Sequence, residues 1–199
     1  AYYGMVSYVD EKIGKILDVL KETGLDDNTV VVFCGDHGEM LGERGMWFKQ
    51  SFYESSVRVP MIVSMPKRFA PARVSAHVSL VDLLPTFMDL ACNNHAPEPV
   101  GPLHGNSLVP LLNGEDAGHD RCVISEYSSE GVSAASRMLR DGPWKYIFTY
   151  GLAPMLFNLE TDPEELQNLA GKAEYASTQQ RLHARLVEDW DPATMHARI

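Results

Sequence analysis

The sequence predicts an α/β protein in two parts. The first is an incomplete parallel or mixed sheet with helices, and the second is a smaller α+β subdomain with a short antiparallel sheet and a C-terminal helix. Near the N-terminus, apolar residues at helical spacing precede a run of strand-forming residues. That run, Val30–Phe33, is apolar without a break, which is typical of a parallel strand buried on both faces. Beyond residue 120, closely spaced strand candidates separated by turns indicate an antiparallel meander.

The first predicted element is an amphipathic helix over residues 6–20, followed by a strand over residues 29–34. Gly24 supplies the left-handed stop of the helix, and residues 26–28 form a turn. The apolar positions of the helix recur every three or four residues: Val6, Val9, Ile13, Ile16, Leu17 and Leu20.

Residues 35–56 are rich in glycine, charge and aromatic residues and predict a long loop, a kind of segment that is usually functional in a compact domain. A second short strand is expected over residues 60–64. A helix is expected over residues 80–91, where Ser79 and Asp82 have the spacing of a capping box. Pro85 either kinks this helix or starts its main part.

A linker rich in proline, asparagine and histidine spans residues 93–105, so we expect one domain over residues 1–95 and a second over residues 96–199. Thr161, Asp162 and Pro163 open a predicted helix whose acidic first turn the helix dipole favours. A last helix is predicted over residues 174–190. Four strands are predicted in the second domain: Cys122–Tyr127, Ser136–Arg140, Lys145–Tyr150 and Met155–Leu159.

The net charge of −10 argues against a nucleic-acid partner, which needs clustered Lys and Arg. No apolar run approaches the roughly 20 residues of a membrane helix, so no membrane partner is expected. The 3 cysteines are widely spaced and form no disulfide framework, which favours a reducing, cytoplasmic location. The start at Ala1 reads like the inside of a longer chain.

Asp36 and His37 follow the first predicted strand directly and precede a glycine. The carboxyl ends of parallel strands are where ligands collect, so this pair predicts a divalent-cation site. A hard cation prefers oxygen ligands, which makes Asp36 the stronger candidate, while His37 either binds the metal or donates to a substrate oxygen. The alternative is that Asp36 caps the next turn and His37 bonds a backbone carbonyl.

Two further residues are candidates for contacts with a substrate. Lys49, which ends the loop that begins with the Asp-His pair, can offer a positive charge to a tetrahedral anion, although a lysine beside two aromatic residues is often a plain surface residue. Glu126 ends a predicted strand, and its alternative is a solvated or arginine-paired carboxylate. His77, His95 and His104 show no ligand spacing and are interpreted as structural or surface residues.

An ordered series of motifs resembles the type I sulfatases of the alkaline-phosphatase-like superfamily, and among them the choline sulfatases. Residues 28–43 resemble the second metal-binding segment of that family. Three later segments resemble its D-L-x-P-T, G-x-S-L-x-P-L-L and L-Y-D-L-x-x-D-P-x-E stretches: residues 81–86, 105–112 and 156–165. The resemblance implies a partial alkaline-phosphatase-like sandwich.

The resemblance also implies hydrolysis of a small-molecule sulfate ester, choline sulfate above all, by a formylglycine nucleophile and a divalent metal, with Ca²⁺ first and Mg²⁺ or Mn²⁺ as alternatives. It implies Asp36 and His37 as metal ligands, Lys49 and His37 as catalytic residues, and Lys49 and Glu126 as substrate contacts. The parent enzyme is expected to be a homo-oligomer.

In such enzymes the formylglycine motif and the first metal-binding aspartates lie upstream, and this chain does not contain them. We therefore expect the C-terminal portion of a sulfatase, inactive alone, with an exposed strand edge. Two alternatives stay open. One is a phosphonate monoester or phosphodiester hydrolase of the same superfamily, and the other is a non-catalytic binding or assembly module.

Overall fold

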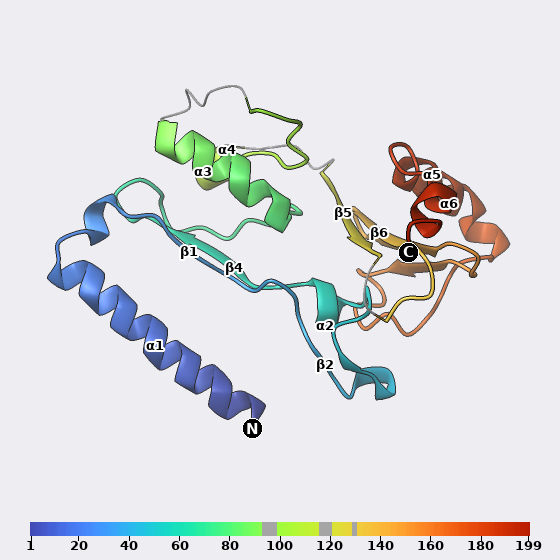
Figure 1. Ribbon diagram of the computed structural model, residues 1–199, viewed down its shortest axis with the longest axis horizontal. Coiled ribbons are helices and arrows are strands. Elements are labelled where there is room, and N and C mark those ends of the chain that lie inside the picture. Colours follow the sequence, from blue (N-terminus) through green and yellow to red (C-terminus); the bar gives the residue numbers. More distant parts are fainter. Residues whose placement is uncertain (93–98, 116–120, 129–130) are drawn as a thin grey trace. The chain divides into compact units, whose positions relative to one another are not determined.

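The computed structural model describes residues 1–92, 99–115, 121–128 and 131–199 (Figure 1). The chain divides into two compact units. The first unit contains residues 1–35 and 60–73, and the second contains residues 36–59 and 74–199. The predicted domain boundary at residues 95 and 96 falls within residues 93–98, outside the described residues, and stays a prediction.

The first unit consists of a long helix and a two-stranded sheet. Helix α1 spans Tyr2–Glu22 and is followed by Gly24 at a φ of 67°, as the predicted stop requires. A 3-10 turn, η1, spans Asp26–Asn28. Strand β1 (Val31–Cys34) then pairs with β4 (Met61–Ser64) in antiparallel register, from Val31 opposite Ser64 to Cys34 opposite Met61.

The predicted parallel strand, buried on both faces, is therefore wrong. Strand β1 runs antiparallel to its partner, and the Phe33 side chain is 38% exposed. A continuous apolar run specifies an extended backbone with two apolar faces, but it does not specify the direction of the neighbouring strand. Each strand of this sheet has one edge without a ladder partner among the described residues.

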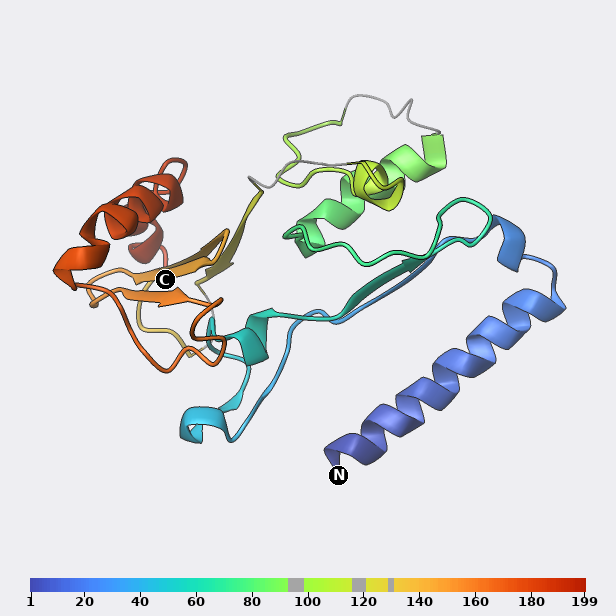
Figure 2. The same ribbon diagram turned by 180° about the vertical axis from the view of Figure 1, so that it is seen from behind.

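The second unit is built around a four-stranded antiparallel sheet with consecutive strands paired: β5 (Cys122–Tyr127), β6 (Ser136–Asp141), β7 (Trp144–Thr149) and β8 (Met155–Asn158). The predicted meander is confirmed. Helix α5 (Ala176–Leu186) packs against this sheet, and α6 (Pro192–His196) follows it (Figure 2). The core between them contains Leu139, Tyr146, Leu156, Leu182, Leu186 and Trp190.

A capping box begins the helical segment of the second unit, as predicted. The 3-10 turn η3 spans Leu80–Asp82 and leads into α3 (Leu83–Cys92), with Pro85 in its first turn. The buried Asp82 carboxylate accepts hydrogen bonds from the backbone N–H groups of Ser79 and Asn106, both at 2.8 Å. The short helix α4 (Val109–Leu112) follows.

The predicted helix opening at Thr161 is absent. The Asp162 carboxylate accepts hydrogen bonds from Leu166 N at 3.0 Å and Gln167 N at 2.8 Å, and Glu165 has a φ of 56°. An aspartate that holds nearby backbone N–H groups in this way forms a turn instead of a helix. The C-terminal segment begins with the turn η4 (Ala173–Tyr175), so α5 is shorter than predicted.

None of the helices in the described part of the chain combines the length and apolar character that a membrane span needs.

Candidate active site

The structure brings together three of the four residues that the sequence predicts for the site. Nε2 of His37 lies 3.0 Å from Nζ of Lys49 and 3.5 Å from Oδ2 of Asp36. All three residues belong to the second unit and have exposed side chains, with 87% of the Asp36 side chain accessible. A carboxylate, an imidazole and an ammonium group therefore share one solvent-facing position.

The contacts of His37 define its tautomer. Nδ1 lies 2.8 Å from the carbonyl oxygen of Gly38. A carbonyl oxygen can only accept, so Nδ1 carries the proton and donates it. Nε2 then presents its lone pair to the Lys49 ammonium. A histidine with one ring nitrogen fixed on a backbone carbonyl has the other oriented for a metal or a proton donor.

The Asp36 carboxylate is held in its charged form. Its Oδ1 accepts a hydrogen bond from His37 N at 2.9 Å. Backbone hydrogen bonds, first that of His37, lower the pKa of Asp36 below its ordinary value, and the nearby His37 and Lys49 contribute further. The carboxylate is therefore negative at neutral pH and accessible to a cation.

A close backbone approach positions the Asp-His pair. Gly38 N donates to Ser56 O at 2.7 Å, and Glu39 N donates to Ser55 O at 2.8 Å, which ties the pair to α2 (Glu54–Val57). A Cβ placed on Gly38 would lie 2.0 Å from the Ser55 carbonyl oxygen. Glycine is required here because any side chain would push the two backbones apart.

Residues 35–56, predicted as an irregular loop, contain short regular elements. Strand β2 (Met40–Leu41) pairs with β3 (Trp47–Phe48), and the 3-10 turn η2 (Glu43–Gly45) joins them. Phe48 has a φ of 71°, which is rare for a residue with a bulky side chain. This backbone conformation directly precedes Lys49 and helps to direct the lysine toward His37.

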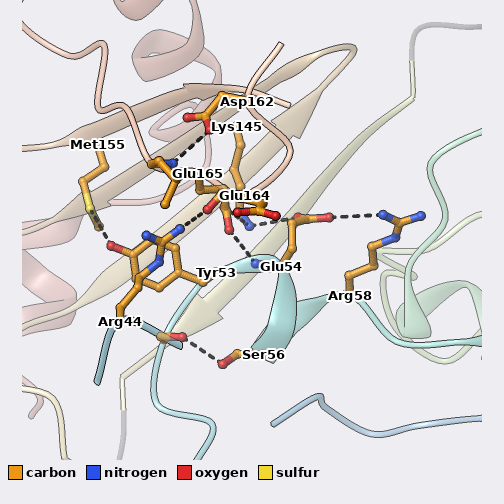
Figure 3. A network of polar contacts seen from close by, with 12 residues as sticks. Arg44, Tyr53, Glu54, Ser56, Arg58, Lys145, Met155, Asp162, Glu164 and Glu165 are labelled. Atoms are coloured by element: carbon orange, nitrogen blue, oxygen red, sulfur yellow. Dashed lines mark hydrogen bonds and ion pairs between the residues drawn. The ribbon is translucent and has the colours of Figure 1, made fainter. Parts of the chain in front are cut away.

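A buried ionic cluster joins α2 to the four-stranded sheet (Figure 3). Lys145, fully buried on β7, has its Nζ 2.9 Å from Oε1 of Glu54 and 2.7 Å from Oε1 of Glu165. Glu165 Oε2 also accepts a hydrogen bond from Glu54 N at 2.8 Å. Beside this cluster, the Arg44 guanidinium lies 4.0 Å from the centre of the Tyr53 ring and donates to the carbonyl oxygen of Glu164.

The sequence did not predict this cluster, because Glu165 falls in the acidic first turn of the helix predicted to open at Thr161. The signal that was available is Lys145 itself, a charged residue between Trp144 and Tyr146 in an otherwise apolar strand. A lysine at such a position is rarely fully buried unless it is paired.

Glu126, the fourth predicted site residue, is paired with arginine. Its Oε2 accepts a hydrogen bond from Arg137 Nε at 2.9 Å, and 31% of its side chain is exposed. Gly131 does lie near the lysine segment, since a Cβ on it would lie 3.7 Å from Cγ of Gln50. A residue five positions after Glu126 therefore lies beside the residue next to Lys49.

The described residues offer Asp36 and His37 as two adjacent metal donors. Within the described ranges, no group of three or more His, Cys, Asp or Glu side chains could hold a metal ion. A calcium ion takes about 6–8 oxygen ligands, so this pair does not make a complete cation site. Of the other histidines, His77 is half-buried, His104 is exposed and His95 lies outside the described residues.

Comparison with known proteins shows which family the chain is similar to. Residues 1–93 match the protein family described as Sulfatase. The choline-sulfatase of Rhizobium meliloti (strain 1021) is 43% identical over 171 residues, which are 85% of this chain and 32% of that protein. Arylsulfatase K of Gallus gallus is 41% identical over 182 residues, 86% of this chain and 33% of that protein.

Two solved structures have the same fold over most of the chain. The phosphonate monoester hydrolase of Agrobacterium radiobacter is 28% identical with a TM-score of 0.81, covering 99% of this chain and 40% of that one. A protein in complex with its substrate D-glucosamine-2-N,6-O-disulfate is 30% identical with a TM-score of 0.78, covering 94% and 40%. The chain thus spans about a third of the length of the curated relatives that it matches.

Proposed function

Because this chain belongs to the sulfatase family, whose match covers residues 1–93, we propose that it forms one side of the active site of a sulfuric ester hydrolase. The observation that carries the proposal is the 3.0 Å contact between Lys49 Nζ and His37 Nε2, beside the exposed Asp36 carboxylate. The three residues lie on one loop. Lys49 supplies a positive charge for a sulfate ester, and Asp36 supplies a negative charge for a divalent cation.

Lys49 would bind a sulfate oxygen and stabilise the negative charge that develops on the leaving oxygen. A preorganised positive charge at that point lowers the barrier because it needs no reorganisation during the reaction. His37, with its Nδ1 proton held by Gly38, would keep Nε2 directed at the same position. None of the 3 cysteines of this chain begins a formylglycine motif, so we assign no nucleophile within it.

A divalent cation, when bound, would neutralise sulfate oxygens. We propose Asp36 and His37 as two of its ligands, with Ca²⁺ as the first candidate and Mg²⁺ or Mn²⁺ as alternatives. Two donors by themselves are too few to hold such an ion.

For the substrate we propose choline sulfate, hydrolysed to choline and sulfate. The support is the likeness to a choline-sulfatase over most of the chain and the approach of Gly131 to Gln50. Glu126, at the end of that strand, is the proposed contact for the quaternary ammonium group, for which it would have to compete with Arg137.

A second candidate is hydrolysis of phosphonate monoesters. It is favoured by the likeness to a phosphonate monoester hydrolase over nearly the whole chain. The Asp-His pair and the lysine suit a phosphonate as well as a sulfate, because both are tetrahedral anions.

A chimera tests these proposals. Residues 1–199 would replace the matching segment of the Rhizobium meliloti choline-sulfatase, and the hydrolysis of choline sulfate and of an aryl phosphonate ester would be measured. We expect turnover of choline sulfate, and we expect Lys49→Ala to lower kcat by about 10²–10³. Lys172→Ala, which removes an exposed lysine, is the matched control.

Each other outcome has a definite meaning. Preference for the phosphonate ester would favour the second candidate. A folded chimera without turnover of either ester would indicate a non-catalytic binding or assembly module. A chimera whose rate does not change with Lys49→Ala would remove Lys49 from the mechanism.

A further inference from the structure

A cavity of about 300 Å³ lies in the second unit, and none of the three clustered site residues lines it. Its walls come from four segments that are distant in the sequence. Ser75 and His77 precede η3, Arg121 precedes β5, and Arg140 lies on β6. Glu160, which follows β8, is exposed at the rim.

Arg140, which lines the cavity, has one side-chain donor without a protein partner. Its Nη1 is buried and has no hydrogen-bond partner among the described residues. Buried donors in proteins are almost always paired, so an unpaired guanidinium N–H calls for a water or an anion. Burial also lowers the pKa of Arg140, which shows how poorly its charge is solvated.

The carboxylates that attract Arg140 do not pair with its Nη1. Glu54 and Glu165 act on Arg140 electrostatically, but both are engaged by the buried Lys145 at 2.9 and 2.7 Å. Glu160 also attracts Arg140, from its exposed position at the rim. Arg140 therefore lines the cavity while one of its donors, the buried Nη1, has no partner among the described residues.

Three further polar residues, Arg121, His77 and Ser75, also line the cavity. Arg121 Nη2 donates to Asp82 Oδ2 at 2.6 Å, which fixes the orientation of a second guanidinium in the cavity wall. Burial and the charge of Arg140 lower the pKa of His77, whose ring is hydrogen-bonded to the backbone of Arg121 and is held in place beside the cavity. Ser75 adds a hydroxyl-bearing residue to the lining.

We propose that this cavity binds a small oxyanion of the sulfate or phosphate class, with the guanidinium of Arg140 as its principal donor and Arg121 beside it. Charged N–H donors in a fixed fork suit tetrahedral oxyanions better than monatomic anions such as chloride, because they can pair with two oxygens at once. The cavity has room for more than one such ion, so it also accommodates a small organic ester. The site stands independently of the proposed sulfatase activity, because it uses none of that activity's residues.

The first experiment is an NMR titration of the 199-residue chain with sodium sulfate, sodium phosphate or sodium acetate, with ionic strength held constant by sodium chloride. We expect saturable shifts, at millimolar sulfate or phosphate, in the amides of residues 75–77 and 140–142 and in the Nε–H of Arg140. Acetate should bind more weakly. Shifts that do not saturate, or that spread evenly over the exposed basic residues, would overturn the proposal.

Variants then test the residue that carries it. Arg140→Gln should weaken sulfate binding at least tenfold, and Arg140→Lys should weaken it less because the charge remains. Arg73→Gln, which removes a charge from an exposed arginine outside the cavity, should bind sulfate as the wild type does. Equal affinity in Arg140→Gln, or an equal loss in Arg73→Gln, would contradict a specific site. The wild-type titration decides even if Arg140→Gln does not fold.

Discussion

The ammonium group of Lys145 lies 2.7 Å from the carboxylate of Glu165. The lysine side chain has no exposed surface, so the carboxylates around it compensate its charge in place of solvent. The same ammonium group also contacts Glu54 at 2.9 Å, at the first residue of the helix that supports the Asp-His pair. The ion cluster therefore fixes the loop of the candidate active site against the four-stranded sheet.

Lys145→Met should lower the free energy of unfolding by about 3–5 kcal/mol, because it leaves two carboxylates near a buried apolar side chain without their cation. Urea unfolding followed by circular dichroism measures this change. Lys15→Met, which breaks an exposed ion pair with Glu11 on α1, should change stability by less than about 1 kcal/mol. Equal effects of the two substitutions would mean that the buried cluster contributes no more to the free energy of unfolding than an exposed ion pair does.

The contact between Gly38 and Ser55 gives a second prediction. Gly38→Ala should lower the melting temperature and separate His37 from Lys49, because the new Cβ would lie 2.0 Å from a backbone oxygen. The loss is measurable as changed chemical shifts of the His37 ring. Gly14→Ala is the control, since nothing lies within 4 Å of its Cβ position on α1, and it should be neutral or stabilising by up to about 1 kcal/mol. An unchanged His37 environment in Gly38→Ala would show that the close approach is dispensable.

The sequence could predict the Asp36, His37 and Lys49 group because all three residues lie on one loop after one strand. The capping box of Ser79 and Asp82 was predictable for the same reason, since it depends on local spacing. Strand direction was not predictable, because pairing depends on a segment elsewhere in the chain. The Lys145 cluster joins residues that are 91 positions apart in the sequence, and no local pattern reports such a contact.

The lowered pKa of His77 predicts that the protein loses stability in acid. Burial is the main cause of its lowered pKa, followed by the charge of Arg140. A histidine with a folded pKa below its unfolded value of about 6.5 binds protons more readily when unfolded. Its contribution to stability is therefore present above about pH 6.5 and is lost as the pH falls through the folded pKa.

His77→Gln should accordingly show a smaller fall in melting temperature between about pH 7 and pH 5 than the wild type does. His104→Gln, at an exposed histidine, should keep the wild-type fall. A fall of the same size in all three proteins would show that His77 is not the group responsible.

Glu126→Gln tests the choline assignment in the chimera. The substitution removes the charge proposed to attract a quaternary ammonium group, so KM for choline sulfate should rise while KM for a neutral aryl sulfate stays unchanged. The pairing with Arg137 at 2.9 Å predicts a modest rise of about tenfold or less, because the carboxylate is already partly neutralised. An equal loss with both substrates would assign Glu126 to the structure of the sheet, through Arg137, and not to substrate binding.

The small number of metal donors predicts that the isolated chain does not bind calcium at millimolar concentration. Asp36 and His37 would contribute only two ligands, and the described residues contain no group of three His, Cys, Asp or Glu side chains that could hold a metal. A ligand present at 100 times its dissociation constant stabilises a protein by about 2.7 kcal/mol, whereas one present well below that constant has almost no effect. Millimolar calcium should therefore leave the melting temperature of the wild type and of Asp36→Asn the same. A rise of many degrees in the wild type that Asp36→Asn abolishes would show that this chain completes a cation site by itself, and it would require further oxygen ligands beyond those two side chains.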